Sequence, residues 1–126
     1  MATPVIPFSS SEDPKDPSLP KCVFDSQGNT LYFSRSLIPY YRNTSSGTYY
    51  KHIGIYAFRK HFLMKYSEIP NTPLQTAEDL EQLRVLEMGY KIKAVTVTED
   101  SIEVNEPKDL LNLTSVRCKE ILSLMG

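Results

Sequence analysis

Short apolar runs separated by polar, turn-forming stretches dominate the first half of the chain. Residues 21–24 and 31–34 are two such runs, and both contain the aromatic or β-branched residues that favour strands. The segment between them, residues 25–30, is polar and contains Gly28. This arrangement predicts two strands joined by a hairpin connection.

The clearest strand pattern covers residues 51–58. Apolar positions alternate there with polar or small ones, which is the two-residue period of a strand. The pattern predicts a strand with two different faces. One face is expected to carry Ile53, Ile55 and Ala57, and the other His52, Gly54 and Tyr56.

Two segments in the middle of the chain have helical patterns. The first covers residues 59–67 and ends before Pro70, because the residue before a proline disfavours helical backbone. The second is predicted to begin with Thr76 as its N-cap and Asp79 in the capping-box position, and to run to about residue 88. Gly89 follows, and glycine commonly ends helices.

The last part of the chain predicts one more strand and one more helix. Residues 91–98 alternate small, apolar and β-branched side chains, as strands do. Residues 107–125 begin with a proline at the first helical position and carry an apolar stripe at helical spacing. Strands that alternate with helices indicate an α/β fold with a mixed sheet flanked by helices.

The first twenty residues differ in composition from the rest. Residues 1–20 hold five of the nine prolines and several serines, so we expect an extended or disordered lead-in. Within it, residues 2–6 could be the end of a strand that lacks its partners. The remaining chain, residues 21–126, is expected to form one domain.

Composition narrows the functional classes. A chain of 126 residues with a formal net charge of −1 has no overall field that would attract nucleic acid or an anionic membrane. No stretch approaches the roughly 18 apolar residues of a membrane span, and the first residues show no secretory pattern. Two cysteines, Cys22 and Cys118, are too few for a disulfide framework. We therefore expect a reduced, cytoplasmic protein.

Polar and small residues on one face of the 51–58 strand could form a binding surface. Four residues along a strand span roughly 13 Å. At that separation His52 and Tyr56 could hold two hydroxyls of one sugar, with an open slot above Gly54 between them. The alternative is a half-buried strand in which both side chains form internal hydrogen bonds.

Arg35 directly follows the 31–34 strand, and ligands often bind at strand ends. A guanidinium there can bind a sugar carboxylate through two parallel charge-assisted hydrogen bonds, which lysine cannot reproduce. Residues 26–67 contain cations and no carboxylate, whereas the charged residues between 68 and 106 are mostly carboxylates. This split can mark an anion site beside an acidic surface, but solvated surface charges would give the same pattern.

Glu81 and Gln82 are adjacent in the predicted second helix, so their side chains diverge by about 100°. Gln82 could reach one hydroxyl of a ligand while Glu81 takes another. Alternatively, Glu81 is a favourable charge near the start of a helix and pairs with other surface groups.

Three motifs in this order resemble the 3-deoxy-manno-octulosonate (Kdo) cytidylyltransferase family, also called CMP-Kdo synthetases. They are Tyr-Phe-Ser-Arg-x-x-Ile-Pro at residues 32–39, His-Ile-Gly-Ile-Tyr-Ala-Phe-Arg at residues 52–59, and Leu-Glu-Gln-Leu-Arg at residues 80–84. The resemblance covers about residues 21–111 and corresponds to the carboxyl-terminal half of the family. It implies the matching half of a Rossmann-like nucleotide-diphospho-sugar transferase fold.

The resemblance also implies a reaction. Family members join CTP to Kdo in the bacterial cytoplasm and release pyrophosphate, which yields CMP-Kdo for lipopolysaccharide biosynthesis, with Mg²⁺ as cofactor. The arginine–glycine loop that grips CTP has no counterpart in this chain. The chain would therefore supply the sugar site and is not expected to turn over substrate alone.

Site residues follow from the same resemblance. The expected sugar-binding set is Arg35, His52, Tyr56, Glu81 and Gln82, with Arg35 facing the sugar carboxylate. Residues 32–41 are similar to the family's dimer-forming region, which implies a homodimer. Where the family has an aspartate ligand for Mg²⁺, this chain has Asn105, whose neutral carbonyl is a poorer ligand.

Two other functions fit parts of the pattern. A non-catalytic sugar-binding or dimerisation module would explain Asn105 and the missing CTP loop. A single-stranded nucleic-acid binder would explain the tyrosines and cations interleaved between residues 32 and 66. No RNA-binding signature accompanies them and the chain is slightly acidic, so nucleic acid is not an expected partner.

Overall fold

The computed structural model of the chain describes residues 1–43 and 47–100. Its strands are β1 (Ala2–Pro7), β2 (Lys21–Phe24), β3 (Thr30–Ser34), β4 (Tyr50–His52) and β5 (Lys93–Thr96). Its helices are α1 (Lys60–Tyr66), α2 (Pro73–Glu78) and α3 (Leu83–Glu87). This mixture of strands and helices confirms the α/β prediction.

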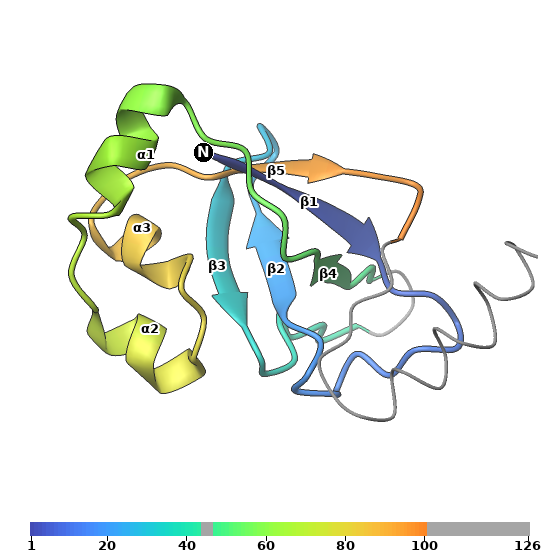
Figure 1. The fold of residues 1–126 in the computed structure, drawn as a ribbon. Helices are drawn as coiled ribbons and strands as arrows, with labels where there is room; N and C mark the ends of the chain where they lie inside the picture. The colour runs from blue at the N-terminus through green and yellow to red at the C-terminus, as the bar shows by residue number, and fades with distance from the viewer. Residues whose placement is uncertain (44–46, 101–126) are drawn as a thin grey trace, which may run out of the picture.

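The five strands form one mixed sheet in the order β3-β2-β4-β1-β5. β1 and β5 are parallel, and the other neighbouring strands are antiparallel. Figure 1 shows the three helices gathered on the side of the sheet where β3 lies. Among the described residues, no helix has the length and apolar character needed to cross a membrane.

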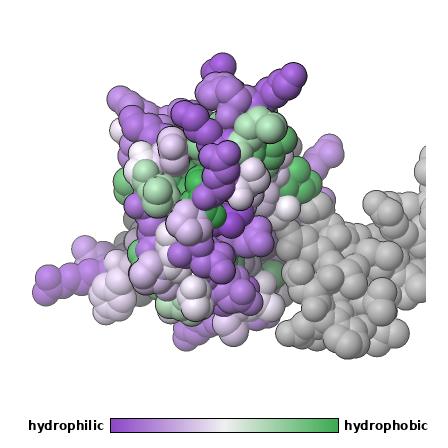
Figure 2. All heavy atoms as spheres, turned by 60° about the vertical axis from the view of Figure 1, so that its left-hand side comes forward, coloured by the Kyte–Doolittle hydropathy of each residue, from purple (hydrophilic) through white to green (hydrophobic). Residues whose placement is uncertain are grey.

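The core lies between the sheet and the helices. Apolar side chains from strands, helices and the segment before β5 meet there, and burying such side chains is the main favourable contribution to folding. The least exposed are Val5, Phe33, Leu83, Val85 and Ile92, all at 0%. The helical side, which comes forward in Figure 2, is largely hydrophilic with smaller apolar areas between.

Residues 2–7 form an inner strand. β1 pairs with β4 on one side and with β5 on the other. The expectation that this segment lacks partners is therefore wrong. The partners lie about 50 and 90 residues further along the chain, a separation that local pattern does not reveal.

The predicted hairpin is confirmed by the antiparallel pairing of β2 with β3. Its connection contains Gly28 with a φ of 79°, in the left-handed region that glycine adopts without a steric penalty. The predicted helix over residues 59–67 corresponds to α1, and the predicted strand over residues 91–98 to β5. The predicted helix over residues 107–125 lies outside the described residues.

The predicted long strand over residues 51–58 is wrong beyond its first residues. β4 ends at His52, and the backbone then turns tightly, with the Ile55 N–H donating to the Ile53 carbonyl at 2.7 Å. A hydrogen bond over two residues marks a γ-turn, which breaks the alternation of faces. Ile53 is consequently buried at 3% exposure, whereas Ile55 is 59% exposed.

The predicted helix over residues 76–88 is two helices. α2 begins earlier than expected, with Thr72 as its N-cap and Pro73 at its first position. Asp79 has a φ of 52°, and this left-handed conformation ends α2. Thr76 and Asp79 are therefore not the start of a helix, and residues 80–82 form a link to α3.

Lys51 joins β4 to two other segments of the chain. Its side chain in β4 is 9% exposed, and its Nζ donates to Glu12 Oε1 at 2.5 Å and to Asp100 Oδ2 at 2.6 Å. Burial opposes the charge on the ammonium, but the bonds to Asp100 and Glu12 outweigh it and raise the pKa of Lys51. The bonded carboxyl of Glu12 has its pKa lowered, against the opposing effect of burial.

Candidate functional site

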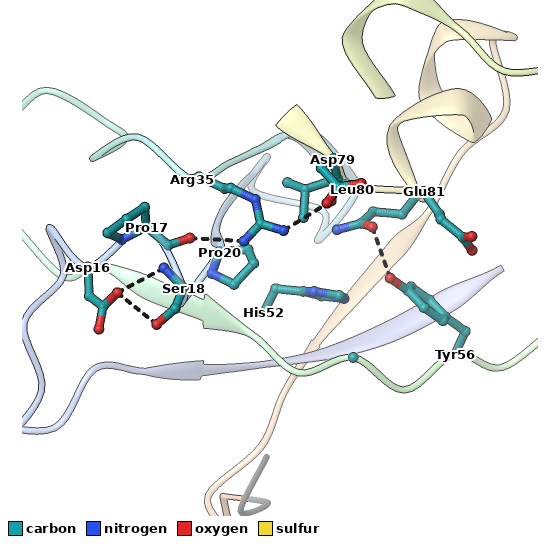
Figure 3. A pocket seen from close by; sticks show the side chains of 12 residues that line it. Asp16, Pro17, Ser18, Pro20, Arg35, His52, Tyr56, Asp79, Leu80 and Glu81 are labelled. Atoms are coloured by element: carbon teal, nitrogen blue, oxygen red, sulfur yellow. Dashed lines mark hydrogen bonds between the residues drawn. The ribbon is translucent and has the colours of Figure 1, made fainter. Parts of the chain in front are cut away.

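The five predicted site residues line one pocket. Arg35, His52, Tyr56, Glu81 and Gln82 all contribute to the wall of a cavity of about 570 Å³. The other lining residues are Asp16, Pro17, Ser18, Pro20, Gly54, Asp79 and Leu80. Figure 3 shows His52 between Arg35 and Tyr56, with Asp16 and Ser18 at the end far from Tyr56.

The pocket forms where regular elements end. Arg35 is the residue after β3, and His52 is the last residue of β4. Tyr56 follows the tight turn after β4, and residues 79–82 link α2 to α3. Residues 16–20 lead into β2. Loop and terminal positions of this kind, held by a rigid sheet, commonly carry binding groups.

Neutral carbonyl groups hold the Arg35 guanidinium. Nε donates to the Glu78 carbonyl at 2.7 Å, Nη1 to the Pro17 carbonyl at 3.0 Å, and Nη2 to the Asp79 carbonyl at 3.0 Å. A guanidinium has five N–H groups, so two remain for a ligand. Among residues 1–43 and 47–100, no carboxylate forms an ion pair with Arg35, so its positive charge is not neutralised directly.

The carboxylate of Glu78 binds the end of β3. It accepts from the Ser34 hydroxyl at 2.6 Å, from the Arg35 backbone N–H at 3.0 Å and from the Tyr32 hydroxyl at 3.3 Å. Partial burial opposes ionisation, but these bonds outweigh it and lower the pKa of Glu78. Sequence reasoning missed Glu78, because nothing in the spacing of residues 35 and 78 signals that they meet.

Thr3 fixes the orientation of the His52 ring. The Thr3 hydroxyl lies 2.9 Å from His52 Nε2 and donates its hydrogen to the Ile55 carbonyl at 2.8 Å. The alternative of an internally bonded histidine is therefore supported by this contact, although His52, 4% exposed, still lines the pocket.

Tyr56 and Gln82 form a direct pair. The Tyr56 hydroxyl donates to Gln82 Oε1 at 3.0 Å, and the Tyr56 ring centroid lies 5.5 Å from that of His52. The predicted separation of roughly 13 Å along a strand is wrong, because the turn after β4 brings the rings together. Gln82 is 3% exposed, and its Nε2 has no hydrogen-bond partner within the described chain, so it can donate to a ligand.

Glu81 occupies the rim. It is exposed, and its carboxylate accepts from the Tyr66 hydroxyl at 3.4 Å, while the Arg84 guanidinium carbon lies 4.2 Å from the Tyr66 ring centroid. Glu81 and Gln82 lie in the link between two helices, so the argument from a 100° divergence along one helix does not apply. Glu81 is the predicted site residue with the weakest tie to the pocket interior.

The chemistry of the lining suits an acidic ligand with several hydroxyl groups. One guanidinium offers two N–H groups and a charge, which is the preferred partner of a carboxylate. The amide of Gln82 adds a donor, and the carboxylate of Asp79 can accept from a hydroxyl.

The predicted metal position, Asn105, lies outside the described residues. Within residues 1–43 and 47–100 there is no group of three or more histidine, cysteine, aspartate or glutamate side chains that could hold a metal ion.

Comparison with known protein families gives a match over most of the chain. Residues 1–92 match the family described as Cytidylyltransferase. The chain belongs to this cytidylyltransferase family. The matched region contains all five predicted site residues and every described strand except β5.

Individual relatives agree with the family. The chain is 44% identical over 123 residues to a 3-deoxy-manno-octulosonate cytidylyltransferase of Protochlamydia amoebophila, covering 95% of this chain and 48% of that protein. It is 50% identical over 105 residues to the protein of the same name from Synechococcus elongatus, covering 82% and 43%. The chain thus spans about half the length of these relatives.

A solved structure shares the fold. CMP:2-keto-3-deoxy-manno-octonic acid synthetase complexed with CTP superimposes with a TM-score of 0.85 at 38% sequence identity. The alignment covers 94% of this chain and 49% of that one. The predicted sheet with flanking helices of a nucleotidyltransferase is thereby confirmed.

The prediction that the chain corresponds to the carboxyl-terminal half of the family is wrong in position. The family match begins at residue 1 and ends at residue 92. It therefore includes the first twenty residues, which were expected to precede the matched region, and excludes the end of the chain. The predicted family is confirmed, and the chain does span about half the length of its relatives.

Proposed function

We propose that the pocket binds the sugar acid Kdo for the transfer of a cytidylyl group from CTP. The observation that carries the proposal is the state of Arg35: its guanidinium is fixed by three carbonyls, keeps two N–H groups and has no carboxylate partner in the described chain. The names of the relatives supply the identity of the acid.

Each lining residue has a distinct role in this proposal. Arg35 binds the sugar carboxylate through charge-assisted hydrogen bonds. Gln82 donates its amide to a sugar hydroxyl, and its other end is held by Tyr56. His52 forms the floor, oriented by Thr3. Glu81 contributes an acceptor at the rim.

The reaction joins a hydroxyl oxygen of the sugar to the α-phosphorus of CTP. The bond from that phosphorus to the bridging oxygen breaks, and pyrophosphate leaves. Because the chain spans about half its relatives' length, we assign sugar binding to this chain and cytidylyl transfer to an enzyme that also holds CTP. A homodimer and Mg²⁺ stay predictions.

Calorimetric titration of the folded chain with Kdo tests the proposal. We expect saturable binding that Arg35→Ala weakens about 10- to 100-fold, the range for hydrogen bonds to a charged group. Arg35→Lys keeps the charge but loses the planar fork, so it should weaken binding by less than alanine does. Arg42→Ala, an exposed arginine outside the pocket, is the matched control.

The result has a clear contrary outcome. Absence of Kdo binding by the folded wild-type chain, or equal losses for Arg35→Ala and Arg42→Ala, would contradict the proposal. Repeating the titration with CTP tests whether this chain also holds the nucleotide. Coupling between the two ligands would indicate a CTP site in the chain, whereas Kdo binding that is independent of CTP agrees with a chain that supplies the sugar site alone.

A further inference from the structure

The Glu78 side chain connects α2 to the end of β3 beside the pocket. Its two carboxylate oxygens accept from three donors: the Ser34 hydroxyl, the Tyr32 hydroxyl and the Arg35 backbone N–H. The shortest of these bonds, from Ser34 Oγ, is 2.6 Å. The Ser34 hydroxyl in turn accepts from the backbone N–H of Ser36 at 3.0 Å, so the chain is held on both sides of Arg35.

The backbone at the end of α2 holds the other end of Arg35. The Glu78 and Asp79 carbonyls accept from Nε and Nη2. The carboxylate of Glu78 therefore fixes the backbone of Arg35 while the Glu78 carbonyl fixes its guanidinium. Without the bonds from the carboxylate to the end of β3, the position of the Arg35 backbone relative to its guanidinium would no longer be fixed.

We propose that Glu78 is a positioning residue for Arg35, and that its carboxylate places the two remaining N–H groups of the guanidinium toward the carboxylate of a sugar acid. The identity of the ligand rests on the function proposed above. Glu78 does not line the pocket, so its effect on the ligand passes through Arg35.

A double-mutant cycle tests whether Glu78 acts through Arg35. Glu78→Gln keeps the size of the side chain, but one of its two ends becomes an amide donor that cannot accept from the Ser34 hydroxyl or the Arg35 N–H. We expect Kdo binding to weaken about tenfold in the wild-type background, as for one lost hydrogen bond to a charged group. In the Arg35→Ala background the same change should have no further effect.

Glu87→Gln is the matched control. The Glu87 carboxylate accepts from the backbone N–H groups of Leu74 and Gln75 at the opposite end of α2, away from the pocket. It should leave Kdo binding unchanged. Equal weakening by Glu78→Gln with and without Arg35, or equal weakening by Glu87→Gln, would overturn the proposal.

A measurement without ligand tests the positioning role of Glu78 independently of the proposed Kdo binding. The Arg35 Nε–H, which donates to the Glu78 carbonyl, should give a protected ¹⁵N–¹H resonance in the wild type. Glu78→Gln should speed its exchange with water, and Glu87→Gln should not. An unchanged Arg35 resonance in Glu78→Gln overturns the positioning role, whereas a changed resonance with no Kdo binding by the wild type overturns only the proposed function.

Ser34→Ala keeps the test decisive if Glu78→Gln does not fold. It removes only the hydroxyl that lies 2.6 Å from the Glu78 carboxylate. The Arg35 Nε–H should again exchange faster, and Kdo binding should weaken by less than in Glu78→Gln. No change in either measurement would overturn the proposal.

Discussion

The apolar core and the polar pocket of this chain are built in opposite ways. The core takes fully buried side chains such as Val5, Phe33 and Ile92 from regular elements and the segment beside β5. The pocket takes polar side chains from the ends of β3 and β4 and from the link after α2. Burial fixes the first, whereas hydrogen bonds to backbone carbonyls fix the second, so stability and binding should respond to different substitutions.

The largest effect on stability is expected in the core. Ile92→Ala removes a side chain at 0% exposure and should lower the free energy of unfolding by about 2 to 5 kcal/mol. Urea unfolding followed by circular dichroism measures this loss. The molecules that stay folded should bind Kdo as the wild type does, because Ile92 does not line the pocket. A fall in the free energy of unfolding of less than about 1 kcal/mol would contradict the expectation that core substitutions affect stability most.

An intermediate effect is expected at Lys51, whose charged side chain is 9% exposed. Lys51→Met leaves two carboxylates without their shared partner and should cost about 1 to 3 kcal/mol at neutral pH. The lower part of this range is expected for the Asp100 contribution, since that side chain is 42% exposed and can be solvated. Urea unfolding at several salt concentrations measures it.

The ion pair of Lys51 with Glu12 makes the stability depend on pH in a definite direction. The folded pKa of Glu12 is lowered, so its contribution is present above the ordinary value of 4.5 and is lost as the pH falls through the folded pKa. The folded pKa of Lys51 is raised, so its contribution is present below 10.5 and is lost as the pH rises through the folded pKa. Lys51→Met should flatten both ends of the stability curve, and unchanged slopes would refute the pairing.

The smallest effect is expected in the pocket. Tyr56→Phe removes the hydroxyl that binds Gln82 Oε1 and should lower stability by about 1 kcal/mol. Its effect on Kdo binding should be larger in proportion, because the Gln82 amide loses the contact that orients it. Urea unfolding and Kdo titration of the same preparation compare the loss of stability with the loss of binding. A stability loss as large as that of Ile92→Ala would contradict the expectation that pocket substitutions affect stability less than core substitutions.

Local pattern was sufficient where local interactions decide the structure. The hairpin of β2 and β3, the helix α1 and the strand β5 follow from alternation, helical period and turn residues within about ten positions. The family resemblance named the five pocket residues, and the structure brings all five to one cavity. Whether they bind a sugar stays a prediction.

Long-range contacts account for what the sequence did not reveal. The pattern of residues 2–6 suggested a strand end without partners, since the partners in β4 and β5 are distant along the chain. Thr3 and Glu78, which orient His52 and Arg35, lie 49 residues from His52 and 43 from Arg35. The turn after β4 replaced an expected strand, because its backbone hydrogen bond competes with the alternation of side chains.

The left-handed backbone of Asp79 constrains any redesign of this protein. Asparagine and glycine tolerate such a conformation, but a β-branched residue does not. A valine introduced at position 79 would favour an ordinary φ and rotate the carbonyl away from the guanidinium to which it is now hydrogen-bonded, and it would also remove a carboxylate from the pocket wall. Asparagine at position 79 removes the charge but tolerates the backbone conformation, so comparing Asp79→Asn with Asp79→Val separates the effect of the backbone from the effect of the charge.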